Sequence, residues 1–310
     1  MIEVQQLTKR YGDRFAVKDL SFAVRPGRVT GFLGPNGSGK STTMRVIMGM
    51  DAPTSGTALI NGRTYGELRW PLREVGALLE AKAVHPSRSA YNHLWMLAQT
   101  NAIPRRRVRE VIEMVGLQGV ANRRAGKFSL GMGQRLGIAT VLLGDPEVIL
   151  LDEPVNGLDP EGVRWIRTLL KGLAAEGRTI LASSHLMSEM ALTADDLIVI
   201  GQGELISAGP ITDFIARNTE QFVRVVTPEP RDLTAVLRAA GATVLIEPDD
   251  SLRVTGVTAA VIGDAAHAGR LAIHELTPQR ASLEEAFMGL TDDTIEYRGT
   301  APAAQKVDAR

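Results

Sequence analysis

The 310-residue chain contains no cysteine. This absence excludes disulfides, thiolate metal sites and cysteine nucleophiles, and it suits a reducing compartment, so the expected location is the cytoplasm. No apolar run approaches the roughly 20 residues that a helix needs to cross a bilayer. The first residues, Met1, Ile2 and Glu3, do not begin a charged leader followed by an apolar core. Any role at a membrane is therefore expected to need a partner chain.

A net charge is also lacking, because 35 Lys and Arg residues are balanced by 35 Asp and Glu residues. The balance gives no overall attraction to nucleic acid or anionic lipid, although it allows a local patch, and we expect no nucleic-acid partner. Aromatic residues are scarce at 5%, whereas 44% of the chain is apolar. That apolar share supplies an ordinary buried core for one large domain, or for a large and a small one.

Short strand-like runs alternate with helical stretches from Ile2 to about Ser207. The clearest runs are Val29 to Leu33, Val148 to Leu151 and Thr179 to Ser183. This alternation predicts an α/β domain over residues 1–215 with a largely parallel central sheet. Between about residues 80 and 145 the strand pattern gives way to helical spacing, which we interpret as a helical insertion.

The pattern changes after Gly209 and Pro210. An order of strand, helix, strand, strand, helix and strand over residues 220–290 predicts a small α+β unit of the split βαβ, ferredoxin-like kind. Its elements are expected at Phe222 to Val226, Leu233 to Ala240, Thr243 to Ile246, Leu252 to Thr255, Ala259 to Ala268 and Leu271 to Leu276. It carries no acid pair or glycine-rich loop, so we expect a dimer-stabilising appendage or a ligand sensor. Residues 298–310 are expected to form a disordered tail.

The strongest local signal is a glycine-rich loop between a strand-like run and a helical stretch. It reads Gly34, Pro35, Asn36, Gly37, Ser38, Gly39, Lys40 and Ser41, and continues into Thr42. This matches the phosphate-binding loop of ATP-hydrolysing enzymes in its strand-loop-helix context. Backbone N–H groups would point at the phosphates of ATP, Lys40 would reach the β and γ groups, and Ser41 would ligate Mg²⁺.

Two carboxylates follow the apolar run Val148 to Leu151 directly. Ligands of parallel sheets bind at the carboxyl ends of the strands, where Asp152 and Glu153 are expected to emerge. Asp152 can hold Mg²⁺ through water, and Glu153 can polarise the attacking water as general base. Together with the glycine-rich loop, this pair predicts a P-loop NTPase.

The stretch Phe128 to Arg135 narrows this class. It resembles the LSGGQ signature of ABC ATPases, with Ser129 and Gly131 retained. It differs from that signature at Phe128, Leu130 and Met132. Ser129 can cap the helix that follows, whose positive N-terminus would then face outward. The resemblance implies that Ser129 and Gly131 contact the γ-phosphate held by the opposite subunit of a homodimer.

Further motifs follow in the order of the same family. The run Gly157 to Asp159 resembles the D-loop that couples the two sites of the dimer, and His185 resembles the switch histidine that contacts the γ-phosphate. Tyr11 resembles the aromatic residue that stacks on adenine, and Glu80 stands where most relatives have the Q-loop glutamine, so we interpret it as a ligand of Mg²⁺. The alternatives are a structural histidine, a packed tyrosine and a glutamate that faces solvent.

This resemblance covers residues 1 to about 210 and implies an ATP-binding and ATP-hydrolysing subunit of an ABC transporter. Such a subunit works a separate membrane-spanning permease from the inner face of the cell membrane. Three segments resemble the sequences of ATPase subunits from bacterial exporters of drugs, antibiotics or other hydrophobic compounds. They are Gly76 to Glu80, Ser129 to Arg135 and Ser282 to Leu290.

One alternative function is a soluble ABC-type ATPase that acts on nucleic acid or on the translation machinery. Those proteins carry two ATPase halves or long coiled-coil or zinc insertions, which this sequence lacks. The helical insertion, with Tyr91, His93 and Trp95, is expected either to touch the membrane-spanning subunit or to be interior packing.

Overall fold

The computed structural model describes residues 1–310 except 81–83, 219–221, 280–282, 285 and 288–310. The described chain separates into two compact units, residues 1–211 and residues 212–289. The expected tail at 298–310 and most of the stretch 282–290 lie outside the described residues.

A six-stranded sheet forms the centre of the first unit. Its order is β5 (Val75–Leu78), β6 (Val148–Leu151), β7 (Thr179–Ser183), β3 (Arg28–Leu33), β8 (Asp196–Gly201) and β9 (Glu204–Pro210). Strands β5, β6, β7, β3 and β8 pair in parallel, and only β9 runs antiparallel to its neighbour. All four residues of β6 are buried, as expected for a parallel strand covered on both faces. The predicted parallel sheet is therefore confirmed.

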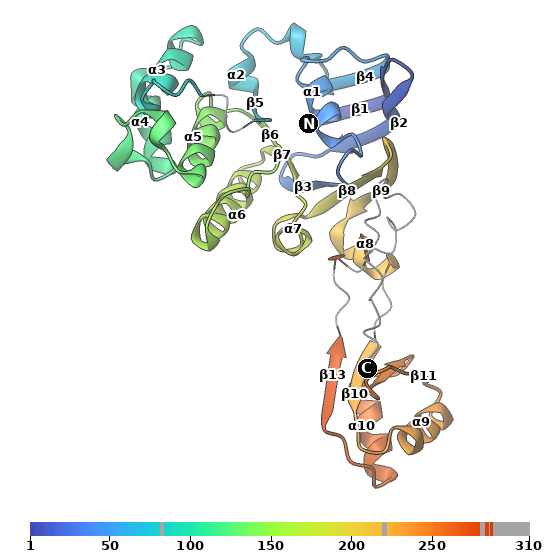
Figure 1. Ribbon diagram of the computed structural model, residues 1–310. Coiled ribbons are helices and arrows are strands. Elements are labelled where there is room, and N and C mark those ends of the chain that lie inside the picture. The colour runs from blue at the N-terminus through green and yellow to red at the C-terminus, as the bar shows by residue number, and fades with distance from the viewer. Residues whose placement is uncertain (81–83, 219–221, 280–282, 285, 288–310) are drawn as a thin grey trace, which may run out of the picture. The chain divides into compact units, whose positions relative to one another are not determined.

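A second sheet of three antiparallel strands was not predicted from the sequence. Its order is β2 (Arg14–Val24), β1 (Ile2–Tyr11) and β4 (Ser55–Ile60). Its inward residues share one core with β3, β6 and helix α1 (Lys40–Ile47), so this sheet and α1 cover one face of the parallel sheet. Figure 1 shows the three strands in blue beside α1.

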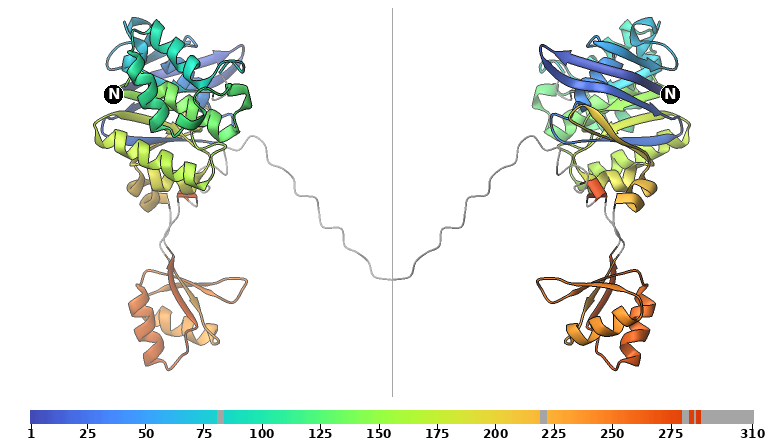
Figure 2. Two further views of the ribbon diagram at one scale, coloured as in Figure 1. Left: turned by 90° about the vertical axis from the view of Figure 1, so that its left-hand side faces the viewer. Right: turned by 90° about the vertical axis from the view of Figure 1, so that its right-hand side faces the viewer.

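Helices gather on the other side of the parallel sheet. They include α3 (Ala90–Thr100), α4 (Arg105–Met114), α5 (Leu130–Leu142), α6 (Pro160–Ala175) and α7 (Met187–Thr193), with short 3₁₀ turns η2 (Gln118–Val120) and η3 (Ala125–Lys127). Two further short elements are η1 (Tyr65–Glu67) and α2 (Pro71–Glu74), and Tyr65 of η1 packs against the core that contains α1. Helices α3, α4 and α5 form the expected insertion and share a core with α6 and the sheet. Figure 2 shows the insertion in teal and green on one side and the blue strands on the other.

His93 of α3 belongs to the interior of the insertion. The side chain is 7% exposed, and its Nε2 lies 3.5 Å from Thr140 Oγ1 of α5. Burial lowers the pKa of this imidazole, and the charge of Arg88 lowers it further. Of the two alternatives for His93, interior packing is therefore confirmed, because the side chain packs between helices. Tyr91 and Trp95 are half-buried.

The second unit contains a four-stranded antiparallel sheet with the order β11, β12, β10, β13. Its elements are α8 (Ile211–Asn218), β10 (Phe222–Val226), α9 (Pro230–Ala239), β11 (Thr243–Ile246), β12 (Leu252–Thr255), α10 (Ala259–Ala268) and β13 (Glu275–Gln279). From β10 to β13, the order and pairing are those of a split βαβ unit. The last strand begins at Glu275 instead of Leu271, because the pairing with β10 ends at Val226 and Thr227 Oγ1 donates to Ala272 O instead, at 2.7 Å.

Candidate functional site

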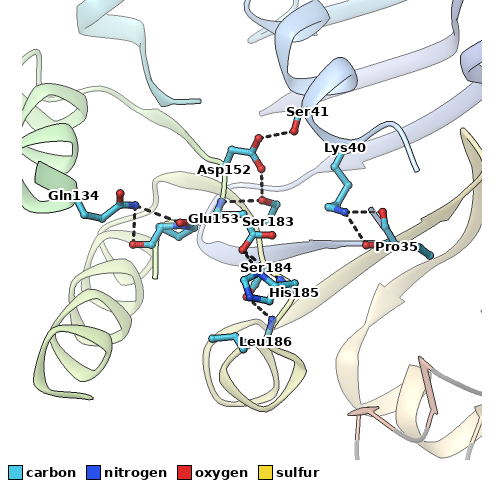
Figure 3. Close-up of polar contacts among 12 residues, drawn as sticks. Pro35, Lys40, Ser41, Gln134, Asp152, Glu153, Ser183, Ser184, His185 and Leu186 are labelled. Carbon is cyan, nitrogen blue, oxygen red and sulfur yellow. Dashed lines mark hydrogen bonds and ion pairs between the residues drawn. The ribbon is translucent and has the colours of Figure 1, made fainter. Parts of the chain in front are cut away.

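The glycine-rich loop lies between the end of β3 and the start of α1. Gly39 has φ +101°, and a Cβ at this position would overlap with the backbone oxygen of Ala16, so only glycine fits. Lys40 Nζ donates to Gly34 O at 2.7 Å and to Pro35 O at 3.0 Å (Figure 3). The loop therefore curls around the ammonium group of the first residue of α1.

Lys40 is only 9% exposed. Burial lowers the pKa of its ammonium group, and the nearby carboxylates of Glu153 and Asp152 partly oppose this shift. Ser38 Oγ is also buried and has no hydrogen-bond partner in the part of the chain described. A buried cation beside an unsatisfied hydroxyl and a helix N-terminus suits a phosphate group.

Asp152 and Glu153 follow β6, as predicted. Ser41 Oγ donates to Asp152 Oδ2 at 2.7 Å, which links α1 to the end of β6. Ser183, the last residue of β7, donates to Asp152 Oδ1 and accepts from Glu153 N at 2.9 Å. One fully buried hydroxyl group thus fixes the positions of both acidic residues.

Glu153 and His185 face each other. His185 Nδ1 lies 2.7 Å from Glu153 Oε2, and His185 N donates to the same oxygen at 3.4 Å. Glu153 has a left-handed backbone with φ +51°, and its carbonyl oxygen accepts from Gln134 Nε2 at 3.3 Å. Figure 3 shows the contacts that run from Ser41 through Asp152, Ser183 and Glu153 to His185. Such sparsely populated backbone conformations cluster at functional sites.

Ser129 is the N-cap of α5, and its Oγ accepts from Met132 N at 3.3 Å. Asp159 is likewise the N-cap of α6, and its Oδ1 accepts from Gly162 N at 2.8 Å. Within the described residues, the hydrogen bonds of Ser129 remain at the start of α5, and none leads to the phosphate loop. The predicted signature residue is therefore not brought to the phosphate loop of its own chain.

The signature and the D-loop contact each other directly. A Cβ added at Gly157, which has φ +77°, would overlap with the side chain of Leu130, and one added at Gly131 would lie 3.0 Å from Gly157 O. Leu130 is nevertheless 57% exposed. The leucine that replaces the family's first signature glycine thus packs on one side against the D-loop.

Tyr11 lies at the end of β1 and is half-exposed. Its hydroxyl donates to Asp51 Oδ2 at 3.0 Å, and Lys9 Nζ lies 4.8 Å from the centre of its ring. Asp51 also accepts from Arg45 Nε at 2.7 Å. These contacts hold the ring in place and leave part of it exposed, and its stacking on adenine stays a prediction.

Glu80 is exposed and lines a cavity of about 740 Å³ together with Ser41, Asp152 and His93. Within the described ranges no cluster of three or more His, Asp or Glu side chains is arranged to hold a metal ion. The Ser41 hydroxyl and the carboxylates of Asp152 and Glu80 instead provide too few ligands for an ion held by protein alone. They suit a Mg²⁺ ion that takes its other ligands from phosphates and water. The donor set therefore fits magnesium bound together with a nucleotide.

Two residues at this site were not predicted from the sequence. Ser183 ends the strand next to β6, and Gln134 lies within the signature stretch, where Gln134 Nε2 also donates to Pro154 O at 3.0 Å. Both form hydrogen bonds with the acidic pair, although they lie in segments distant from it in sequence. The one available signal for Ser183 was its place at the carboxyl end of a strand.

Two family models match this chain. One, described as ABC transporter, matches residues 17–156, and the other, a domain of unknown function, matches residues 221–284. The ABC transporter ATP-binding protein YhcH of Bacillus subtilis (strain 168) is 36% identical over 307 residues, 96% of this chain and 97% of its own. The bacitracin transport ATP-binding protein BcrA of Bacillus licheniformis is 40% identical over 221 residues, 70% of this chain and 72% of its own.

A solved structure is also similar to the first unit. It is a dimeric ATP-binding cassette in a post-hydrolysis state, bound to ADP and Pi, and it superposes with a TM-score of 0.63 at 26% identity over 68% of this chain and 99% of that one. No helix among the described residues is both long and apolar enough to cross a membrane. The family matches confirm the resemblance found in the motifs. The chain belongs to the ATP-binding subunits of ABC transporters, and its reaction is the hydrolysis of ATP.

Proposed function

We propose that this subunit powers the export of a drug, an antibiotic or another hydrophobic compound through a separate membrane-spanning subunit. The similarity to a bacitracin transport protein supports this proposal, as does the amino-acid sequence of the signature stretch, which resembles that of drug exporters. The membrane-spanning subunit selects the compound, and this chain supplies the energy. A soluble ATPase acting on nucleic acid is not favoured, because the relatives are ABC transporter and bacitracin transport proteins.

The observation that carries the proposed mechanism is the continuous set of contacts from Ser41 to His185. Glu153 is the general base, because its carboxylate keeps some exposure to solvent and can accept a proton from the attacking water. His185 orients that carboxylate through the 2.7 Å contact. Phosphoryl transfer to water depends mainly on positioning and charge neutralisation, so no covalent intermediate is needed.

The residues of the phosphate loop bind the nucleotide. The N–H groups of the loop and Lys40 neutralise the phosphates, and Tyr11 stacks on adenine. Ser41, Asp152 and Glu80 would hold Mg²⁺, which offsets phosphate charge when bound. The buried Lys40 and the Ser41–Asp152 hydrogen bond of 2.7 Å support this arrangement.

A second copy of the chain completes each site in this proposal. Two subunits close head to tail, so that Ser129 and Gly131 of one subunit contact the γ-phosphate bound by the other. The capped start of α5 supports this role, because its free N–H groups and positive end favour an anion. Asp159 couples the two sites through the start of α6. The dimer lies on the inner face of the cell membrane, where part of the helical insertion contacts the permease.

Replacing Glu153 with Gln tests the mechanism. The variant keeps the shape of the side chain but removes the base, so ATP should still bind while turnover falls by about 100-fold or more. The closed dimer should then persist, and size-exclusion chromatography with ATP and magnesium should show it. Glu113→Gln, at an exposed position of α4, is the control and should turn over ATP normally. A monomeric Glu153→Gln protein with normal turnover would refute the assigned role.

Export is tested separately from hydrolysis. A membrane-spanning subunit encoded beside this chain should co-purify with it and should raise or restrain its ATPase activity. Stable association with ribosomes or nucleic acid in place of such a subunit would favour the soluble alternative.

A further inference from the structure

Charge is unevenly distributed in this chain, although its net charge is zero. Residues 84–127, which run from the end of the first gap through α3, α4 and η3, contain eight basic residues and only two acidic ones. One of those acids, Glu110, already pairs with Arg106 at 3.0 Å and with Arg107 at 3.4 Å. The helical insertion therefore concentrates positive charge that is balanced elsewhere in the chain.

Five arginines of the insertion form no ion pair within the described part of the chain, and all five are exposed. They are Arg88, Arg105, Arg109, Arg123 and Arg124, which together we call the arginine face. By contrast, Arg28, Arg63, Arg107, Arg167 and Arg178 each pair with a carboxylate. The arginine face is thus a group of cations without anionic partners.

Contacts between the segments place these arginines next to one another. Arg88 O accepts from Ala125 N at 2.8 Å, and Arg124 forms an isolated bridge with Ser89. Arg105 and Arg109 are one turn apart on α4, and they line a hollow of about 440 Å³ together with Tyr91. Tyr91 N in turn donates to Ala121 O at 2.9 Å, which joins α3 to the 121–124 segment. The segments that carry the five arginines therefore lie next to one another in the insertion.

Aromatic rings hold one of these arginines in place. The Arg105 guanidinium lies 5.8 Å from the centre of the Tyr91 ring and 5.3 Å from that of Trp95, and Arg105 Nε donates to Tyr91 Oη at 2.7 Å. Stacking of this kind does not neutralise the charge, so the remaining N–H groups can still bind a phosphate. Tyr and Trp beside Arg form a combination that suits the headgroup region of a membrane.

We propose that the arginine face binds the anionic phospholipid headgroups of the membrane on which this subunit works. The surface is broad, exposed and positive, and phosphodiester groups accept paired hydrogen bonds from guanidinium groups. Each arginine near an anionic membrane surface strengthens binding roughly fivefold. Lipid binding would orient the insertion toward the membrane.

The test measures co-sedimentation of the full-length protein with two kinds of vesicle. One contains phosphatidylglycerol and phosphatidylcholine, and the other contains phosphatidylcholine alone. The protein should bind the first kind only, and binding should weaken as salt is raised. A triple variant, Arg88→Gln, Arg105→Gln and Arg109→Gln, should bind about 100-fold more weakly, from roughly fivefold per arginine.

A matched triple variant controls for the loss of charge. It carries Arg25→Gln, Arg69→Gln and Arg164→Gln, which are exposed, have no ion pair among the described residues and lie outside the insertion. This control should bind vesicles like the natural protein, and both triple variants should keep the natural ATPase rate in solution. ATPase rates therefore report on the proposed function independently of the vesicles.

Three results would overturn the proposal. They are equal binding to neutral vesicles, equal losses in the two triple variants, and no binding to either vesicle. The last of these would mean that the arginine face meets an acidic protein surface instead. Circular dichroism of each variant confirms that a loss of binding does not come from unfolding.

Discussion

The ammonium group of Lys40 is largely shielded from water, and it donates hydrogen bonds to two backbone carbonyl oxygens instead. In Lys40→Ala the loop loses the charge that offsets the phosphates, so we expect ATP turnover to fall by about 100-fold or more. Phosphate release measures the effect. Lys171→Ala, at an exposed position on α6, is the control and should retain the natural rate. Natural activity in Lys40→Ala would contradict the assignment of the phosphate loop.

Glu80 lines the same cavity as Ser41 and Asp152, and it supplies a charged oxygen where the family resemblance leads us to expect an amide. If Glu80 contacts Mg²⁺, Glu80→Gln should need roughly tenfold more magnesium for half-maximal ATPase activity. A magnesium titration of both proteins measures this shift, with Glu113→Gln as a control for the loss of an exposed carboxylate. Identical half-saturation in the natural protein and Glu80→Gln would show that Glu80 faces solvent only.

At the scale of helices, two serines provide a matched pair. Ser89 caps α3 by accepting from Asn92 N at 3.2 Å, and Ser129 caps α5 by accepting from Met132 N at 3.3 Å. Replacing either serine with alanine should lower the free energy of unfolding by about 1 kcal/mol, as measured by denaturant titration. Only Ser129→Ala should also lower ATPase activity, because only this cap meets ATP in the proposed dimer. Equal ATPase rates in the two variants would remove Ser129 from the site.

Elements held by a local pattern could be predicted from the sequence. Strands β6, β7 and β10 have the expected bounds, because each is a short run rich in apolar residues. Strand β1 was not recognised as part of an antiparallel sheet. Its pairing slips between Val4 and Leu7, and Gln6 has φ +47°, so the alternation of buried and exposed residues is broken in the middle of the strand.

The candidate site likewise contains residues that a local motif predicts and residues that only tertiary packing brings together. The phosphate loop, the acid pair and the N-caps each consist of residues close together in the sequence, so their roles could be predicted from the sequence. The role of Ser183 depends on the register that sets Leu151 of β6 beside Ala182 of β7, 31 residues away. Gln134 similarly reaches Pro154 O from a helix 20 residues earlier. Contacts of this kind follow from tertiary packing, which no local motif encodes.

At the scale of the whole molecule, the first unit contains every residue proposed for the nucleotide site. A protein that ends before Phe222 should therefore fold and bind ATP like the full chain, because the cores of the first unit use no residue beyond it. Titration with a fluorescent ATP analogue measures binding, and the same truncation with Lys40→Ala is the negative control. Loss of binding in a truncated protein that stays folded by circular dichroism would contradict the separation of roles.

The contact between Leu130 and Gly157 limits how independent the two halves of a dimer can be. In the proposed dimer, Leu130 belongs to the helix start that meets the partner's ATP, and Gly157 belongs to the loop that follows Glu153, the proposed general base. Because the two residues are in contact, a shift of one is expected to displace the other. In the proposed dimer, hydrolysis at one ATP should therefore affect the other site through the Leu130 side chain, and a dimer with one inactive site should hydrolyse ATP at a total rate that differs from half of the natural rate.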